Sequence, residues 1–316
     1  MADFRFLRFA IASLAIAFAP SSTLAQPDPS HPESVTVTGT KSREVIGQFT
    51  KSFATPTVLT GKIARWERGV CPVAVGQKPS FTRFITQRIK YVAIAVGAPV
   101  NSDESCTLNI EIVFTTTPQA LLDNVRKNEA VYLGYAVSSA QLDALAKVTR
   151  PIQAWYTTET VDLIGKRQLD SGRPPESGGV TMASELIMPS SRASGAPTTM
   201  TNAYNARSNG NRIDAGIHSG FNHIMIVVDT TKLADQTIVL LADYISMLAL
   251  TQLSSLDACQ QLPSIVNLLA ADCSHAVEGL TQFDLAYLQG VYKMGPGKSL
   301  ALQRNDIADA MTDTLK

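Results

Sequence analysis

An amphipathic helical pattern of apolar residues lies in segment 81–96. Its apolar side chains recur at three- and four-residue intervals and so fall on one face of a helix. Ser80 precedes the segment as a possible cap, and Gly97 and Pro99 follow it as stop signals. The pattern therefore predicts a long amphipathic helix that covers a core on one side.

Two further segments indicate burial on all sides. Residues 221–229 contain the run Ile224 to Val228 without polar alternation, which is typical of a central strand covered on both faces. Residues 236–253 carry apolar side chains around nearly the whole helical circumference, which predicts a buried helix. Together with the long helix, they indicate an α+β fold: a mixed sheet with a long backing helix and a buried central helix.

Weaker patterns fill the rest of the chain with short elements. Strand-like alternation predicts strands at residues 34–40, 61–67, 107–115, 131–136 and 152–158. Capping residues and helical spacing predict helices at residues 117–127, 139–148, 263–270, 282–294 and 306–314.

Composition divides the chain into parts. Residues 26–45 begin with three prolines and are interpreted as a spacer followed by the short strand. Residues 46–316 are predicted to form a single domain. Within it, residues 169–214 are rich in Ser, Gly, Pro, Ala, Thr and Asn, so we expect a flexible insertion there. Two domains divided at this insertion are the alternative.

The N-terminal segment has the pattern of a signal peptide. Arg5 and Arg8 precede the apolar run 9–19, and Ala25 is the small residue before a cleavage site, so residues 1–25 are predicted to be removed. A membrane anchor is the alternative, but an eleven-residue run spans only about half of a ~30 Å hydrocarbon core. We expect a mature chain that starts at Gln26 and is periplasmic or secreted.

The four cysteines all lie in the mature part, at Cys71, Cys106, Cys259 and Cys273. An even number in an exported chain indicates disulfides, and three pairings are possible. The spacing favours Cys71 with Cys106 and Cys259 with Cys273. A zinc site built from all four thiolates is the competing hypothesis, but no short Cys-x-x-Cys knuckle is present.

The overall charge limits the possible partners. The 316 residues contain 27 basic and 27 acidic side chains, so no net positive field favours nucleic acid. No run of 18 apolar residues follows the N-terminal segment, so we expect no membrane span after cleavage. The partners remain unknown at this stage.

Candidate chemistry is sparse. Residues 294–299 imitate the end of a phosphate-binding loop, but the required earlier glycine is Tyr292, so a turn between two helices is the preferred interpretation. His218 and His223 offer two imidazoles at a spacing that matches no familiar metal site. Trp66 is either a ligand contact or, as we favour, a packing residue beside Cys71. No Gly-x-Ser-x-Gly elbow is present.

Several short motifs carry a resemblance to an uncharacterised family of exported proteins of Gram-negative bacteria. The resemblance covers about residues 60–312 and includes the motifs Arg65-Trp66-Glu67, Ala154-Trp155-Tyr156, Ala242-Asp243-Tyr244, Leu262-Pro263-Ser264-Ile265 and Asp284-Leu285-Ala286-Tyr287-Leu288. The order of elements is also distantly similar to zinc-peptidase-like (zincin) folds. This resemblance implies a zincin-like layout, in which the buried helix would carry the metal motif.

The buried helix lacks that motif. Where two histidines would stand, the chain has Asp243, Tyr244 and Met247, and a catalytic zinc needs three protein ligands and a base. We therefore expect no catalytic residue, no bound metal and no cofactor, and hold these three residues, with His218 and His223, as weak candidates for a cleft. The function expected is that of a non-catalytic envelope protein with a degenerate peptidase-like scaffold. The alternatives are a hydrolase with an unidentified site and a periplasmic ligand-binding protein with a cleft above Tyr244.

Overall fold

The computed structural model describes residues 39–103, 105–170, 206–211, 213–233, 235–254, 256–270, 273 and 277–315. The predicted signal peptide, most of the predicted spacer and strand, and most of the predicted insertion lie outside the described residues. Residues 38–316 group into one unit, to which all described elements belong.

A five-stranded mixed sheet forms the middle of this unit, as predicted. Its strands lie in the order β1 (Pro72–Val75), β2 (Ile110–Thr115), β5 (His218–Asp229), β3 (Ile152–Val161) and β4 (Arg167–Leu169). The first three strands run parallel, whereas β3 is antiparallel to β5 and β4 is antiparallel to β3. The strand predicted to be central, β5, is indeed the middle strand, and its residues from Ile224 to Asp229 are all buried.

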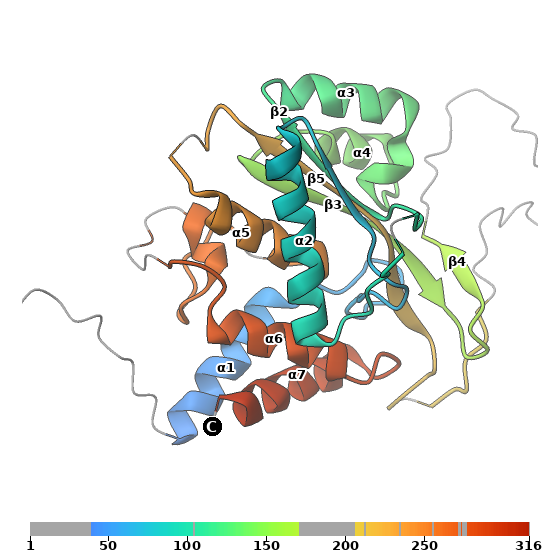
Figure 1. Cartoon of the computed structure of the whole chain (residues 1–316). Helices are drawn as coiled ribbons and strands as arrows, with labels where there is room; N and C mark the ends of the chain where they lie inside the picture. The colour runs from blue at the N-terminus through green and yellow to red at the C-terminus, as the bar shows by residue number, and fades with distance from the viewer. Residues whose placement is uncertain are drawn as a thin grey trace, which may run out of the picture. The chain divides into compact units, whose positions relative to one another are not determined.

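The larger core lies on one face of the sheet. The long helix α2 (Pro79–Val96) packs on β1 and on the buried helix α5 (Ile238–Leu250), and α6 (Gln282–Lys293) contacts α2 (Figure 1). Two further helices, α1 (Gly39–Phe53) and α7 (Leu300–Thr314), pack against each other and join the same core. Ile112 and Ile226 face this core from the sheet.

A smaller core covers the opposite face. It is formed by α3 (Pro118–Asn128), the short 3-10 helix η1 (Ala130–Leu133) and α4 (Ser139–Leu145). Trp155 and Met225 reach it from β3 and β5. The sheet is therefore the middle of three layers, and the α+β fold class with a backing helix and a buried helix is confirmed.

Helix α2 begins and ends for local reasons. Pro79 occupies the first turn, where its missing N–H costs nothing, and Lys78 rather than Ser80 stands at the cap position. At the other end Gly97 adopts a left-handed conformation with φ of 80° and donates its N–H toward Ile94. The predicted stop was thus confirmed, and the predicted cap was wrong because proline extends the helix by two residues.

Aromatic donors cover the carboxyl end of buried helix α5. An α-helix leaves its last four carbonyls without intrahelical partners, and in a core each must find a donor. Trp66 Nε1 donates to the Ala249 oxygen at 2.7 Å, and the Tyr292 hydroxyl donates to Leu250 at 2.8 Å. The Tyr156 hydroxyl lies 3.0 Å from the Leu248 oxygen and 3.2 Å from the Thr251 oxygen. These side chains let an apolar helix end inside the protein.

Both predicted cysteine pairs are at bonding distance. Cys71 joins Cys106 and Cys259 joins Cys273, across sequence separations of 35 and 14 residues. The first bridge ties the start of β1 to the loop before β2, with Cys71 buried. Cys259 of the second bridge is exposed.

Several weaker predictions were wrong. Segment 61–67 makes only isolated bridges, because Arg65 and Trp66 turn to separate partners in the core. Segment 131–136 forms η1 and a turn instead of a strand, since Gly134 has φ of 88° and cannot continue an extended chain. Residues 39 and 40 already belong to α1, so the predicted strand 34–40 cannot extend through them.

Other boundaries shifted. The strand predicted from residue 107 starts at Ile110, because Leu108 is exposed. Residues 263–270 form only the 3-10 helix η3 (Ile265–Leu269), and the last helix starts at Leu300, earlier than predicted. Within the described part of the chain, no helix has the length and apolar character needed to cross a membrane.

Candidate functional site

A cavity of about 280 Å³ opens along the outer edge of β3. It has one wall from each layer of helices, and β3 itself forms the floor. The lining residues are Pro56, Thr57, Val58, Leu133, Gly134, Tyr135, Gln141, Leu145, Arg150, Gln153, Ala154, Trp155, Tyr156, Thr158, Gln252, Leu253 and Leu256. The cavity thus joins chain segments that are about 200 residues apart in the sequence.

The floor of the cavity is a strand edge that no described strand pairs with. Asp229 donates its N–H to the Pro151 carbonyl, and the antiparallel register pairs Gln153 with Val227. Hydrogen-bonded pairs alternate along such a ladder, so the backbone N–H and C=O of Ala154 point away from β5. Strand β4 pairs only with residues 159–161, and no other described strand covers this stretch. Ala154 therefore offers one donor and one acceptor toward the cavity.

The Gly134 backbone limits this edge at one end. A Cβ atom at Gly134 would lie 2.6 Å from the Tyr156 carbonyl oxygen, so only glycine fits there. Further along the same direction, Asp170 covers the next stretch by donating its N–H to the Thr158 carbonyl at 2.8 Å. The open part of the edge therefore ends before Tyr156 and includes Ala154.

Aromatic side chains stiffen both walls. Trp155 donates its Nε1 hydrogen to the Leu145 carbonyl at 2.7 Å and packs in the smaller core. Tyr156, on the next position of the strand, points to the larger core and reaches the end of α5. Burial strongly raises the pKa of the Tyr156 hydroxyl, which therefore stays protonated and acts as a donor.

Polar lining groups are already engaged. Arg150 makes a two-point contact with Asp257, with distances of 2.7 and 2.5 Å, and its hydrogen bonding lowers the pKa of that carboxyl. Gln153 accepts from the Thr149 N–H and donates to the Lys147 carbonyl. The lining that the described residues form contains no Asp, Glu, His, Cys, Ser or Lys. The one charged side chain of the described lining, Arg150, thus has its charge balanced by Asp257.

The weak candidates on α5 are core residues and do not line this cavity. Asp243 is 1% exposed and accepts from Arg88 Nε at 2.5 Å and from the Leu280 N–H at 2.9 Å, so it ties α5 to α2 and to the start of α6. Tyr244 and Met247 are also buried. The Tyr244 hydroxyl has no hydrogen-bond partner among the residues that the structure describes, and burial raises its pKa.

The two candidate histidines have different partners. His223 packs against the Tyr132 ring at 4.7 Å, with its Nε2 3.6 Å from a Glu111 carboxylate oxygen. Burial lowers the pKa of His223 against the opposing effect of Glu111. His218 instead places Nε2 2.7 Å from Glu67. No group of three or more metal-ligating side chains occurs among the described residues.

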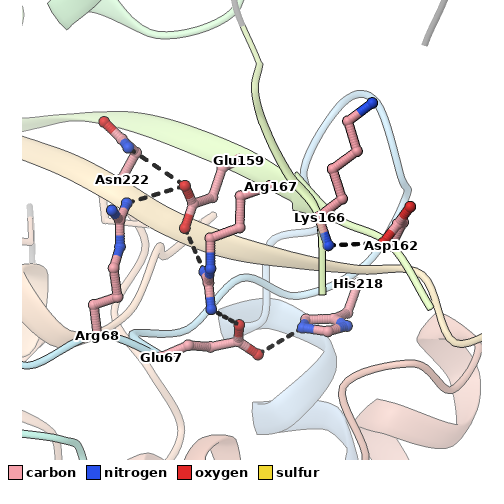
Figure 2. A network of polar contacts seen from close by, with 8 residues as sticks. All are labelled: Glu67, Arg68, Glu159, Asp162, Lys166, Arg167, His218 and Asn222. Carbon is pink, nitrogen blue, oxygen red and sulfur yellow. Dashed lines mark hydrogen bonds and ion pairs between the residues drawn. The ribbon is translucent and has the colours of Figure 1, made fainter. Parts of the chain in front are cut away.

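Glu67 links His218 to a charged network that the sequence analysis missed (Figure 2). Glu159, 3% exposed, accepts from Arg167 at 2.5 Å and from Arg68 at 3.0 Å. Arg167 also reaches Glu67 at 3.0 Å. Burial alone would raise the pKa of Glu67, but its hydrogen bond with His218 and the neighbouring positive charges outweigh burial and lower it. We call Glu67, Arg68, Glu159, Arg167 and His218 the charged network.

The charged network holds the far ends of β3, β4 and β5 together. Each carboxylate in it faces at least one guanidinium, so its charge is balanced within the network. The sequence did contain a signal for the hairpin that places Glu159 and Arg167 in this network, in the turn after β3. There the Asp162 carboxylate accepts from the Ile164 and Lys166 N–H groups, and Gly165 has φ of 80°. Such a turn indicates a hairpin and a strand that extends past Thr158.

Comparisons with family models, with curated proteins and with solved structures found no match.

Proposed function

We propose that this protein is an exported, non-catalytic binding protein and that the cavity at the edge of β3 takes a short extended peptide. The observation that carries the proposal is the unpaired backbone of Ala154 on the floor of a walled cavity. An unpaired strand edge is a ready template for another strand, and peptides use it in many recognition domains.

The walls suit an extended backbone. Successive side chains of a strand point to opposite faces, so a peptide paired with Ala154 would direct alternate side chains toward Leu133 and Leu145 on one side and Leu253 and Leu256 on the other. Arg150 already has its charge balanced by Asp257. An uncharged backbone with apolar side chains therefore matches the lining better than an ionised ligand does.

Binding without cleavage fits the chemistry of the lining. Hydrolysis needs a nucleophile, a base or a metal-bound water next to the scissile bond. The Thr57 and Thr158 hydroxyls of the lining are engaged with Ser219 and Asp170. In this proposal the peptidase-like scaffold keeps a place for a peptide and has lost the groups that would cut it.

Export is part of the proposal. The signal-peptide pattern of residues 1–25 supports it, and two disulfides fit an oxidising compartment such as the periplasm or the exterior. The resemblance to exported proteins of Gram-negative bacteria supports the same location.

Fluorescence anisotropy of a labelled peptide of alternating valine and threonine tests the proposal. The Ala154→Pro variant removes the outward N–H but leaves the ladder to β5, because that N–H does not point to β5. We expect its affinity to fall about tenfold, as loss of one hydrogen bond and a proline clash predict. Ala154→Ser keeps the N–H and should bind like the natural chain.

Two outcomes would contradict this proposal. Equal binding by the Ala154→Pro and Ala154→Ser variants would remove the strand edge from the argument. Cleavage of the peptide during a long incubation, detected by mass spectrometry, would instead support the hydrolase alternative.

A further inference from the structure

A second surface, unrelated to the cavity, lies on the outward face of α2. Between Glu67 and Asp103 the chain contains no acidic residue, but it contains five basic ones: Arg68, Lys78, Arg83, Arg88 and Lys90. Three of them belong to α2, which has no acidic residue of its own. A positive segment of this length is unusual in a chain whose total charge is balanced.

The outward residues of α2 form one stripe. Arg83, Gln87 and Tyr91 follow each other at intervals of four residues, and Lys90 and Ile94 lie beside them on the same helical face. We call these five residues the α2 stripe. All are exposed except Lys90, which is half-buried, whereas Ile85, Ile89 and Val92 on the opposite face are buried.

The α2 stripe exposes apolar side chains at one end. Tyr91 is 65% exposed and Ile94 is 67% exposed, and both lie beyond the two basic residues along the helix. The Arg88 guanidinium sits 5.4 Å from the centre of the Tyr91 ring and also pairs with buried Asp243. This contact orients Tyr91 on the surface although no described element packs over it.

We propose that the α2 stripe docks on the surface of an anionic phospholipid bilayer. Lysine and arginine are attracted to anionic headgroups, and a tyrosine ring suits the headgroup level because it is apolar with a polar tip. Isoleucine beside it adds apolar area that enters the acyl boundary. An acidic protein would also match the charges, but it would not by itself account for an exposed Tyr91 and Ile94 at one end. The membrane is therefore the better match.

The interaction is peripheral and reversible. Its electrostatic part weakens with salt, because exposed charges are screened over about 8 Å at physiological ionic strength. Its apolar part is confined to two side chains. The α2 stripe is independent of the peptide cavity. Helix α2 packs on β1, at one edge of the sheet, whereas the cavity lies along β3, near the opposite edge.

Co-sedimentation with vesicles tests the charges. The purified exported chain should bind vesicles that contain phosphatidylglycerol and should not bind vesicles of phosphatidylcholine alone. The double variant Arg83→Glu/Lys90→Glu should bind at least about 30-fold more weakly. Each basic residue near an anionic surface contributes roughly a factor of five to the affinity, and the variant removes two. Arg88 is left intact because it pairs with Asp243 in the core.

A matched control reverses the same number of charges on the opposite layer. Lys127 and Lys147 are exposed on α3 and after α4. The Lys127→Glu/Lys147→Glu variant has the same net charge as the test variant, so it should still bind the anionic vesicles if the α2 stripe is the contact surface. Circular dichroism checks that both variants fold.

Fluorescence tests the apolar end. Trp66 and Trp155 are buried, so a Tyr91→Trp variant adds a single exposed indole. Its emission should shift to the blue with anionic vesicles, and adding Ile94→Ser should weaken vesicle binding further.

Three results would overturn the proposal: no vesicle binding, equal loss in the test and control variants, or binding to soluble polyglutamate with none to vesicles, which would identify an acidic polypeptide as the partner.

Discussion

The carboxyl end of α5 and the charged network solve the same problem in two ways. Both bury polar groups that need partners. At the end of α5, neutral donors from Trp66, Tyr156 and Tyr292 meet backbone carbonyls. In the charged network, guanidiniums meet the carboxylates of Glu67 and Glu159. Neutral hydrogen bonds are indifferent to salt and to pH near neutrality, whereas ion pairs depend on both, so the two regions should respond differently to solution conditions.

The largest expected effect is at Trp66. Trp66→Ala should lower the free energy of unfolding by about 4 kcal/mol, because it opens a large cavity in the core. Trp66→Phe keeps most of the ring and strands the Ala249 carbonyl, which should cost about 2 kcal/mol. Urea unfolding at low and high salt measures both. A Phe variant as stable as the natural chain would mean that the carbonyl finds another donor.

Glu159→Gln should cost about 2 kcal/mol, since it removes the charge that two guanidiniums share. Arg68 and Arg167 are partly exposed, so water recovers some of the loss. Unlike the loss at Trp66, this loss should shrink at high salt. Glu129→Gln, an exposed control on the far layer, should leave unfolding unchanged. A salt-independent deficit at Glu159 would contradict the ionic interpretation.

Tyr292→Phe tests the neutral contacts of one hydroxyl, which also lies against the Trp66 backbone N–H. It removes only the hydroxyl that donates to Leu250, and we expect a loss of about 1 kcal/mol that is the same at low and high salt. Thermal or urea unfolding of the variant under both conditions is the measurement. A loss that varies with salt would show that the two regions are less distinct than their contacts indicate.

The smallest effect concerns pH. The pKa of Glu67 lies below its ordinary value of 4.5, so its charge stabilises the folded chain above that value, and the contribution is lost as the pH falls through the lower folded-state pKa. The difference between the natural chain and Glu67→Gln should therefore be constant from about pH 7 to 5 and disappear at lower pH. Because Glu67 is partly exposed, we expect less than about 1 kcal/mol. The deficit of Trp66→Phe should not change over the same range.

The periodicity of apolar residues was sufficient to predict the elements that bury a continuous face. The helix α2, the central strand β5 and the buried helix α5 follow from apolar spacing alone. Capping residues predict the helix at 282–294, and Thr281 with Asp284 forms a capping box at the start of α6. Segments without a continuous face were misassigned. In segment 61–67 and around Gly134, the backbone follows individual tertiary contacts that leave no regular pattern in the sequence.

The candidate site was harder to predict than the fold. The cavity depends on which edge of β3 remains unpaired, and that follows from strand order, which no local pattern encodes. Glu159 lies one residue beyond the predicted strand 152–158, and its partners, Arg68 and Arg167, lie on other segments. The absence of a metal motif on α5 was readable from the sequence, but the use of Asp243 as a tie between helices was not.

The aromatic donors at the end of α5 also constrain the order of folding. Their hydrogen bonds span 183 residues from Trp66, 92 from Tyr156 and 42 from Tyr292. Closing such long loops costs conformational entropy that only later contacts offset, and contacts between residues this far apart in the sequence slow folding. The carboxyl end of α5 therefore completes its hydrogen bonds late, after three distant parts of the chain have met. Mutations of these donors should chiefly accelerate unfolding and leave the folding rate nearly unchanged.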